Sequence, residues 1–337
     1  SMLLTDLAYP AAWRDEAAAV AGALKRYDRY IVCGHAHLDG DALASVTAAG
    51  FLLRALGREF VLYSPYGVPA YLEFVERPAS VYTSLARLPF TPQCVLALDL
   101  GTPSRLGDEL GALLPSLACV NVDHHPGPGM GTVANMIRPE AAATAQLLAS
   151  VIHASGADFT PAMASALMTG LITDTGGFRH SNTGPEVLAL ASELSLRGAD
   201  IHAIRECLDK TWTIPRFRLW SRLSAKVSTA ASGAVAICSC TLDDLGSTTT
   251  TQEDCEGFVE RMLSLKGVRI AALLKEQDPG KTSFSLRAAG DSDVAAIAAV
   301  FGGGGHVKAA GGTIALPADE AENELLAAIL RTAPKPL

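Results

Sequence analysis

The first half of the chain alternates short apolar runs with helical patterns, and this alternation restricts the fold more than any other feature of the sequence. The expected strands are "RYIVCGH" (29–35), "EFVLYS", "QCVLALDL" and "LACVNVDHH". Helical patterns lie between several of them, as in "DGDALASVTAAGFLLRALG" and "SRLGDELGALLP". Strands and helices that alternate at this spacing indicate an α/β fold with a doubly wound, mainly parallel sheet. Two later helical segments, "AAATAQLLASVIHASG" and "PAMASALMTGLITDTG", are expected to cover it.

The pattern changes along the second half, and 337 residues are enough for two domains with cores of their own. We expect residues 1–185 to form the sheet domain and residues 186–228, which are helical and strand-free, to form a linker. Residues 229–337 are expected to form a smaller α+β domain, with helices at 251–265, 292–301 and 318–332. Within it, "DPG" (278–280) predicts a hairpin turn between two strands.

Composition and charge exclude several classes of protein. The longest apolar stretches are interrupted by charges, so we expect no membrane span, and the N-terminus lacks the regions of a signal peptide. Seven cysteines without a CxxC pair predict a reduced, cytoplasmic protein without a cysteine-based metal site. The net charge of −8 disfavours a general surface for duplex nucleic acid. It does not exclude a polyanionic substrate, because bound divalent cations would reverse the local field.

Acidic and histidine residues lie where the predicted strands and one apolar helix end. They belong to four separate segments: His35, His37, Asp39 and Asp41; Asp99; Asp123, His124 and His125; and Asp174. The carboxyl ends of neighbouring parallel strands meet at one edge of a sheet, in a crevice. We therefore expect these side chains to lie close together.

Carboxylates crowded in this way would repel one another and raise one another's pKa unless cations were bound. Two imidazoles and four carboxylates, one of them shared, suit two hard-to-borderline cations such as Mn²⁺ or Mg²⁺. Two such cations, roughly 3.5–4 Å apart, can clamp a phosphoryl group and activate water. The pattern predicts hydrolytic phosphoryl transfer.

Each of these residues also has a structural interpretation. Asp39 and Asp41 could cap the following helix, Asp99 could belong to a turn, and a single histidine at a strand end is commonly a hydrogen-bonding residue. An acid at the end of an apolar helix, such as Asp174, needs a partner if it is buried. If all of these residues had only structural roles, four such roles would have to coincide at one edge of the sheet. We therefore favour the metal site.

Five motifs carry a resemblance to a known family. "HAHLDGD", "ALD", "DHH" and "TDTGGF" resemble, in order, the motifs of the DHH phosphoesterase superfamily, and "FGGGGHVKAAGG" (301–312) resembles the glycine-rich signature of its DHHA1 domain. The resemblance spans about residues 25–315. Length and layout are similar to the nanoRNase/pAp phosphatase subgroup, the bifunctional oligoribonucleases.

The resemblance implies a ligand set for two cations. These ligands are His35 and Asp39 on the first, Asp41, His124 and Asp174 on the second, and Asp99 on both. The family spacing H-x-x-x-D-x-D selects His35, and we assign no role to His37.

The "DHH" triplet is expected to divide its roles. Side chains alternate along a strand, so Asp123, His124 and His125 cannot all face one metal. With His124 as a ligand, His125 is expected to contact the scissile phosphate or to protonate the leaving oxygen. Asp123 is then the partner that orients the site.

The second domain has its own candidate residues. Gly303, Gly304 and Gly305 leave backbone N–H groups unshielded and would make an anion-binding nest with His306, although a tight turn is the structural alternative. The resemblance implies that Arg287 binds a terminal phosphate. The family usually has serine after this arginine and the chain has Ala288, which suggests a lost hydroxyl contact. We expect Lys308 to be solvated rather than a phosphate contact.

The favoured function is hydrolysis of short oligoribonucleotides and of 3′-phosphoadenosine 5′-phosphate (pAp) by a two-cation enzyme, with Mn²⁺ preferred over Mg²⁺ or Co²⁺. The partners are then short single-stranded RNA and small nucleotides, without duplex nucleic acid or membrane, and a homodimer is one compatible assembly. A standalone cyclic-di-AMP or pApA phosphodiesterase is the closest alternative. A RecJ-like single-strand exonuclease, a family-related pyrophosphatase and a non-catalytic nucleotide-binding protein remain further alternatives.

Overall fold

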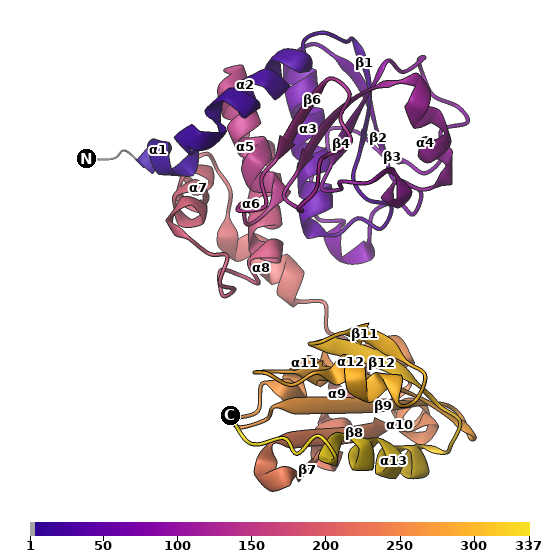
Figure 1. Cartoon of the computed structure of the whole chain (residues 1–337). Helices are drawn as coiled ribbons and strands as arrows, with labels where there is room; N and C mark the ends of the chain where they lie inside the picture. The colour runs from indigo at the N-terminus through magenta and orange to yellow at the C-terminus, as the bar shows by residue number, and fades with distance from the viewer. Residues whose placement is uncertain (1–3) are drawn as a thin grey trace. The chain divides into compact units, whose positions relative to one another are not determined.

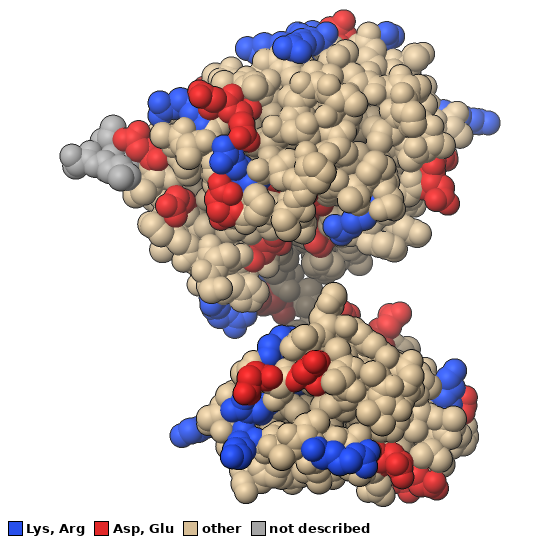
Figure 2. Space-filling view, viewed as in Figure 1, with Lys and Arg blue, Asp and Glu red and all other residues tan. Residues whose placement is uncertain are grey.

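The structure, a computed structural model, describes residues 4–337 and consists of two compact units that divide between Thr211 and Trp212 (Figure 1). Each unit has its own sheet and its own apolar core. On the face of each unit that Figure 2 shows, Lys and Arg side chains are interspersed with Asp and Glu.

The first unit is built on a six-stranded sheet in the order β3-β2-β1-β4-β5-β6, in which every neighbouring pair is parallel. The predicted parallel α/β sheet is confirmed. Two short strands, β3 and β6, add to the four that the sequence predicted. The strands are β1 (Arg29–Cys33), β2 (Glu59–Tyr63), β3 (Val81–Tyr82), β4 (Cys94–Leu98), β5 (Ala118–Asp123) and β6 (Ala134–Ile137).

Helices cover both faces of this sheet, as a doubly wound fold requires. Alternate strand residues supply the two layers: Tyr30 and Val32 join the core beneath α2, α3, α5 and α6, whereas Ile31 and Cys33 join the core beneath α4. The helices are α1 (Leu4–Ala8), α2 (Arg14–Ala23), α3 (Gly40–Ala55), α4 (Asp108–Leu113), α5 (Thr144–Ser155), α6 (Pro161–Asp174), α7 (Pro185–Leu196) and α8 (Ile201–Asp209). Short 3₁₀ helices span Ala11–Trp13, Ala70–Leu72, Pro103–Arg105 and Leu114–Ser116.

The strand order reverses at β1, whose two neighbours are β2 and β4. In an open parallel sheet this reversal leaves a crevice at the carboxyl ends of the strands, where ligands bind. The segment after β1 and the residue after β4 both belong to the predicted metal site, so the topology places that site at the crevice.

Two glycines let the helices that carry the site approach closely. A Cβ atom at Gly40 would lie 2.3 Å from the Thr173 hydroxyl oxygen. At Gly170 it would lie 2.7 Å from the Cβ of Ala145 and 3.1 Å from a carboxylate oxygen of Asp41. The start of α3, the end of α6 and the start of α5 can therefore pack together only because these positions have no side chain.

The second unit is a smaller α+β domain around a mixed six-stranded sheet in the order β11-β12-β10-β9-β8-β7. Only the β8–β9 pair is parallel. Its strands are β7 (Ser228–Ala230), β8 (Val235–Cys240), β9 (Ile270–Asp278), β10 (Lys281–Ala288), β11 (Gly304–His306) and β12 (Ala309–Ile314). Its helices are α9 (Ile214–Lys226), α10 (Leu242–Thr248), α11 (Phe258–Leu263), α12 (Val294–Ala299) and α13 (Ala318–Leu330), with 3₁₀ helices at Ala231–Gly233 and Gln252–Cys255.

The hairpin turn predicted at 278–280 joins β9 to β10 and is confirmed. The helix predicted over 251–265 is interrupted, because Gly257 adopts a positive φ of 85° between the 3₁₀ helix and α11. The segment 186–228 is divided between the units. Leu190 of α7 and Ile204 of α8 belong to the first core, whereas Leu219 of α9 packs in the second unit.

Among the described residues, no helix combines the length and apolar character that crossing a bilayer requires. All seven cysteines are free thiols.

The buried carboxylate of Asp244 gives a test of stability in the second unit. It accepts hydrogen bonds from Arg222 Nε at 2.6 Å, from Lys226 Nζ and from the Thr241 backbone N–H at 2.8 Å. Burial by itself raises the pKa of Asp244, but these partners outweigh burial and lower the pKa from 3.8 to about 2. The carboxylate therefore stabilises the fold above pH 3.8, and this contribution is lost as the pH falls toward 2.

We expect Asp244→Asn to lower the free energy of unfolding by on the order of 2 kcal/mol at pH 7, because a buried charge-assisted network is broken. The difference from wild type should shrink as the pH falls from about 4 to about 2. The free energy of unfolding is measured by urea titration. The fluorescence of Trp212 and Trp220, both in this unit, reports the unfolding. Asp243→Asn is the matched control, since Asp243 is exposed and should contribute little. A variant as stable as wild type at pH 7 would contradict the prediction.

Candidate metal centre

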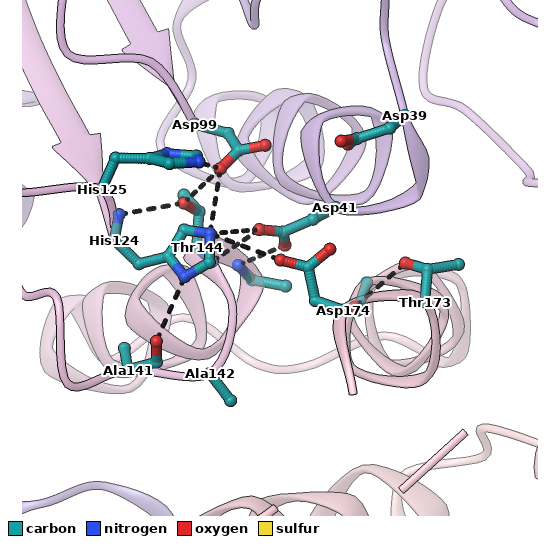
Figure 3. A network of polar contacts seen from close by, with 12 residues as sticks. Asp39, Asp41, Asp99, His124, His125, Ala141, Ala142, Thr144, Thr173 and Asp174 are labelled. Carbon is teal, nitrogen blue, oxygen red and sulfur yellow. Dashed lines mark hydrogen bonds and ion pairs between the residues drawn. The ribbon is translucent and has the colours of Figure 1, made fainter. Parts of the chain in front are cut away.

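Four segments of the first unit bring six of the predicted residues together at the carboxyl edge of the sheet. Figure 3 shows five of them, Asp39, Asp41, Asp99, His124 and Asp174. The six residues come from the segment that joins β1 to the start of α3, the residue after β4, the residue after β5 and the end of α6. The potential ligand atoms form two groups that share the edge: His35, Asp39 and Asp99; and Asp41, His124 and Asp174.

The first group lies around the ring of His35. Its Nε2 atom is 3.4 Å from Oδ2 of Asp39 and 3.5 Å from Oδ2 of Asp99. The other oxygen of Asp39 accepts the backbone N–H of Ala42 at 2.9 Å and caps α3. Asp39 thus combines the two interpretations that the sequence left open, because one oxygen caps the helix and the other faces His35.

The second group lies around the ring of His124. Its Nε2 atom is 3.7 Å from Oδ2 of Asp41 and 3.3 Å from Oδ2 of Asp174. Its Nδ1 atom lies 3.1 Å from the carbonyl oxygen of Ala141, to which the ring donates when Nδ1 carries the proton. That tautomer leaves the Nε2 lone pair directed at the carboxylates, as a metal ligand requires.

Asp99 lies between the two groups. Its Oδ2 faces His35, and its Oδ1 is 3.5 Å from Nε2 of His124. The residue follows β4 with a positive φ of 61°, which is uncommon for a residue other than glycine. This conformation costs on the order of 1–3 kcal/mol and is typical of functional sites. It turns the buried carboxylate back toward both imidazoles.

Backbone and hydroxyl groups at the start of α5 hold the buried carboxylates. The N–H groups of Thr144 and Ala145 donate to the two oxygens of Asp41 at 2.7 and 2.9 Å. The Thr144 hydroxyl donates to Oδ1 of Asp99 at 2.9 Å and accepts the N–H of His124 at 3.3 Å. The positive end of the helix therefore stabilises negative charge at the centre of the cluster.

Electrostatics show that the cluster is rich in negative charge. Burial and the charges of Asp99 and Asp174 raise the pKa of Asp41 well above its usual value. Burial and Asp99 likewise raise the pKa of Asp174 to about 6. Burial would lower the pKa of His35, but Asp39 and Asp99 outweigh it and raise that pKa to about 9.

Divalent cations fit this donor set. Each group supplies one imidazole nitrogen and carboxylate oxygens, with ligand atoms all within 4.8 Å of one another. Cations between them would remove the repulsion that raises the carboxylate pKa values. Oxygen-rich sites with one imidazole suit Mn²⁺ or Mg²⁺ better than soft metals.

His125 and Asp123 have a different geometry. Asp123 is fully buried, and its Oδ1 accepts both the backbone N–H of His125 at 3.1 Å and, at 2.7 Å, the ring Nδ1. Asp99, His124 and His125 could also form a group of ligands, but the His125 atom nearest Asp99 is the Nδ1 that Asp123 holds. The half-exposed ring of His125 is therefore oriented by Asp123.

In the second unit, Arg287 and His306 lie in one row of the sheet. Arg287 of β10 and His306 of β11 both pair with Ala309 of β12, from opposite sides. Residues paired directly across strands point to the same face. Arg287 Nε donates to Glu260 at 2.7 Å, and Nη1 donates to the Leu286 carbonyl at 3.0 Å.

The glycine run forms the β11–β12 hairpin. A Cβ atom at Gly303 would lie 2.3 Å from the Gly311 carbonyl oxygen, and one at Gly305 would lie 2.5 Å from that of Ala309. Of the three glycines proposed for the nest, only Gly305 has a positive φ, of 141°. Close approach of the two strands therefore explains Gly303 and Gly305, whereas a Cβ atom at Gly304 would meet no other atom within 4 Å.

The structure changes two expectations, one about Ala288 and one about Lys308. Ala288 is buried in the apolar core of the second unit, so a serine hydroxyl there would point into that core and not toward Arg287. Lys308 is exposed, yet its amine donates to the carbonyls of Gly290 and Ser292, so it is fixed to the backbone and not fully solvated.

The sequence did not reveal Thr144 or Glu260 as residues of these sites. Thr144 opens an apolar helix and Glu260 lies on the surface of a short one, so neither pattern distinguishes them from ordinary helix positions. "TAQ" after three alanines signals a helix start, which is a weak indication of the buried N–H groups that bind Asp41.

The fold and this acidic–histidine cluster define a phosphoester hydrolase. The family model described as "DHH family, N-terminal domain" matches residues 29–171, and the DHHA1 domain model matches residues 232–334. The chain belongs to the DHH family, whose members are metal-dependent.

Three similar proteins illustrate the range of the family. The Thermus thermophilus "Bifunctional oligoribonuclease and PAP phosphatase NrnA" is 32% identical over 92% of each chain. The Listeria monocytogenes "Cyclic-di-AMP phosphodiesterase PdeA" is 25% identical over 90% of this chain and 47% of its own length. A crystal structure of an exopolyphosphatase-related protein from Bacteroides fragilis has a TM-score of 0.80 at 24% identity, covers 95% of this chain and 96% of its own, and shows the same fold.

The contact between Thr144 and Asp99 predicts a role for this hydroxyl in metal binding. Thr144→Val keeps the shape and the backbone N–H but leaves Oδ1 of Asp99 without its donor. We expect the affinity for Mn²⁺ to fall by about 10–100-fold, as is typical when a partner of a ligand is removed. Isothermal titration calorimetry with Mn²⁺ measures this affinity. Thr144→Ser, which restores the hydroxyl, should stay near wild type, and unchanged affinity in the valine variant would show that the hydroxyl does not position Asp99.

Proposed function

We propose that the protein hydrolyses short oligoribonucleotides and pAp, using two divalent cations held at the candidate metal centre, with Mn²⁺ the favoured ion. The position of Asp99 carries the proposal, because its two carboxylate oxygens face His35 and His124, one in each group. The identity of 32% to a bifunctional oligoribonuclease and PAP phosphatase over nearly the whole chain supports the substrate class.

The first unit supplies the groups for the reacting phosphate. When bound, two divalent cations would lower the pKa of water and neutralise charge on a phosphoryl group. His35 and Asp39 would hold one, Asp41, His124 and Asp174 the other, and Asp99 both. Asp123 orients the His125 ring through Nδ1, so the opposite nitrogen is free to contact the scissile phosphate or to give a proton to the leaving oxygen.

The second unit supplies groups for another phosphate of the substrate. Arg287 keeps its Nη2 atom without a partner among the described residues, while Glu260 fixes Nε. His306 is exposed in the same row of the sheet. We assign both to binding of a terminal phosphate. The N–H of Gly303 already donates to the Ala298 carbonyl at 3.0 Å, so within the glycine run only Gly304 and Gly305 are proposed as additional donors.

Short single-stranded substrates and a cytoplasmic location complete the proposal. The net charge of −8 and the mixed charges of the visible surface are consistent with a site that excludes duplex nucleic acid. Cyclic-di-AMP phosphodiesterase activity is the second candidate, favoured by the 25% identity to such an enzyme over 90% of this chain.

A comparison of substrates separates these activities. With Mn²⁺, we expect a labelled RNA dinucleotide and pAp to be hydrolysed faster than pApA, cyclic-di-AMP or pyrophosphate. EDTA should abolish turnover, and Mn²⁺ should restore it better than Mg²⁺ or Co²⁺. Product formation by chromatography is the measurement. Much faster hydrolysis of cyclic-di-AMP or pyrophosphate than of the dinucleotide would contradict the proposal.

A further inference from the structure

A cavity of about 660 Å³ adjoins the metal centre within the first unit. Its lining includes the candidate ligand His35 together with His37, Tyr63, Tyr66, Arg105 and Glu109. The volume is within the range of about 300–1,000 Å³ that is typical of small-ligand sites. None of the functions assigned above uses this cavity or His37.

Two stacked aromatic rings belong to the lining of the cavity. The rings of His37 and Tyr66 stack with centroids 4.0 Å apart and planes only 9° from parallel. Tyr66 is nevertheless 67% exposed, so much of its ring remains accessible. The pair therefore offers an aromatic face on which a further planar ring could stack.

Two polar groups of the lining have no side-chain partner among the described residues. Tyr63 belongs to the lining and is only 2% exposed, yet its hydroxyl has no hydrogen-bond partner among the described residues. Burial raises the pKa of Tyr63, so the hydroxyl stays protonated and able to donate. The guanidinium of Arg105 likewise has no ion pair or hydrogen bond within residues 4–337.

The backbone around the stack is fixed. The N–H of Ala36 donates to the Arg105 carbonyl at 2.8 Å, and the Ser64 hydroxyl donates to the Ala36 carbonyl at 2.9 Å. The three segments that carry His37, Tyr66 and Arg105 are thereby tied to one another. The cavity is a preformed site.

We propose that this cavity binds the base of the nucleotide whose phosphate lies at the metal centre. The base stacks on the His37–Tyr66 pair, the Tyr63 hydroxyl donates to its polar edge, and Arg105 contributes the positive charge that a nucleotide needs nearby. The proposal rests on the proposed function, because it supplies a specificity subsite for that reaction.

The charges of the lining favour a base over a second phosphate. Asp108 and Glu109 belong to the lining, and Glu109 already accepts hydrogen bonds from the Ser84 hydroxyl and the Leu85 N–H. Two carboxylates would repel another phosphate, whereas they do not oppose a neutral base with amino groups. Stacking on an aromatic ring accepts every base, which suits an enzyme that must not depend on sequence.

The test combines removal of the ring with removal of the base. Tyr66→Ala should raise KM for an RNA dinucleotide at least about tenfold, because stacking is lost, with little change in kcat. For an abasic dinucleotide, with hydrogen in place of both bases, wild type and Tyr66→Ala should have the same KM. Tyr66→Phe keeps the aromatic face and should behave as wild type. Tyr71→Ala removes an exposed tyrosine outside this cavity and serves as the control.

Unchanged KM for the dinucleotide in Tyr66→Ala, or an equal loss on both substrates, would overturn the proposal. If wild type cleaves no dinucleotide, the proposed function fails separately. Calorimetric titration with adenosine 5′-monophosphate then decides on the cavity: a Kd that rises about tenfold in Tyr66→Ala supports base binding, and an unchanged Kd rejects it.

Discussion

The position of the Asp99 carboxylate is the constraint on which the rest of the site depends. A single buried side chain faces His35 with one oxygen and His124 with the other. It reaches both because the residue leaves β4 in a left-handed conformation, where most side chains are disfavoured. The neighbouring parallel strands β1 and β5 then deliver the two histidines to either side of it. Sheet topology and one uncommon backbone conformation together place one carboxylate between the two imidazoles.

Burying several carboxylates is unfavourable unless each has partners, and the surrounding helices provide them. The start of α5 donates two backbone N–H groups to Asp41 and one hydroxyl to Asp99. Close packing of α3, α5 and α6 brings these donors near, and it depends on the absence of side chains at Gly40 and Gly170. The hydrogen bonds that hold the buried carboxylates therefore depend on the close packing of these three helices.

Much of this could be predicted from the sequence, because strands that end in Asp or His at regular spacing must bring those residues to one edge. Asp99 follows from that rule alone, whereas the choice of His35 over His37 and of His124 over His125 as ligands came from the family resemblance. Thr144 could not be predicted, since its contact with Asp99 spans 45 positions and its own segment is an ordinary apolar helix. The glycine run was also ambiguous: glycine permits both an anion-binding loop and close strand pairing. Only the observed pairing of β11 with β12 in a tight hairpin shows that close approach explains Gly303 and Gly305.

The number of Mn²⁺ ions that one chain binds tests the central claim most directly. If Asp99 is shared, equilibrium titration should give two Mn²⁺ per chain, and electron paramagnetic resonance should show the spectrum of an exchange-coupled pair. In Asp99→Ala the coupled spectrum should disappear and at least one ion should be lost, while a melting temperature close to wild type would show that the fold persists. One Mn²⁺ per chain in the wild-type protein, or a coupled pair that survives in Asp99→Ala, would contradict a site organised around this carboxylate.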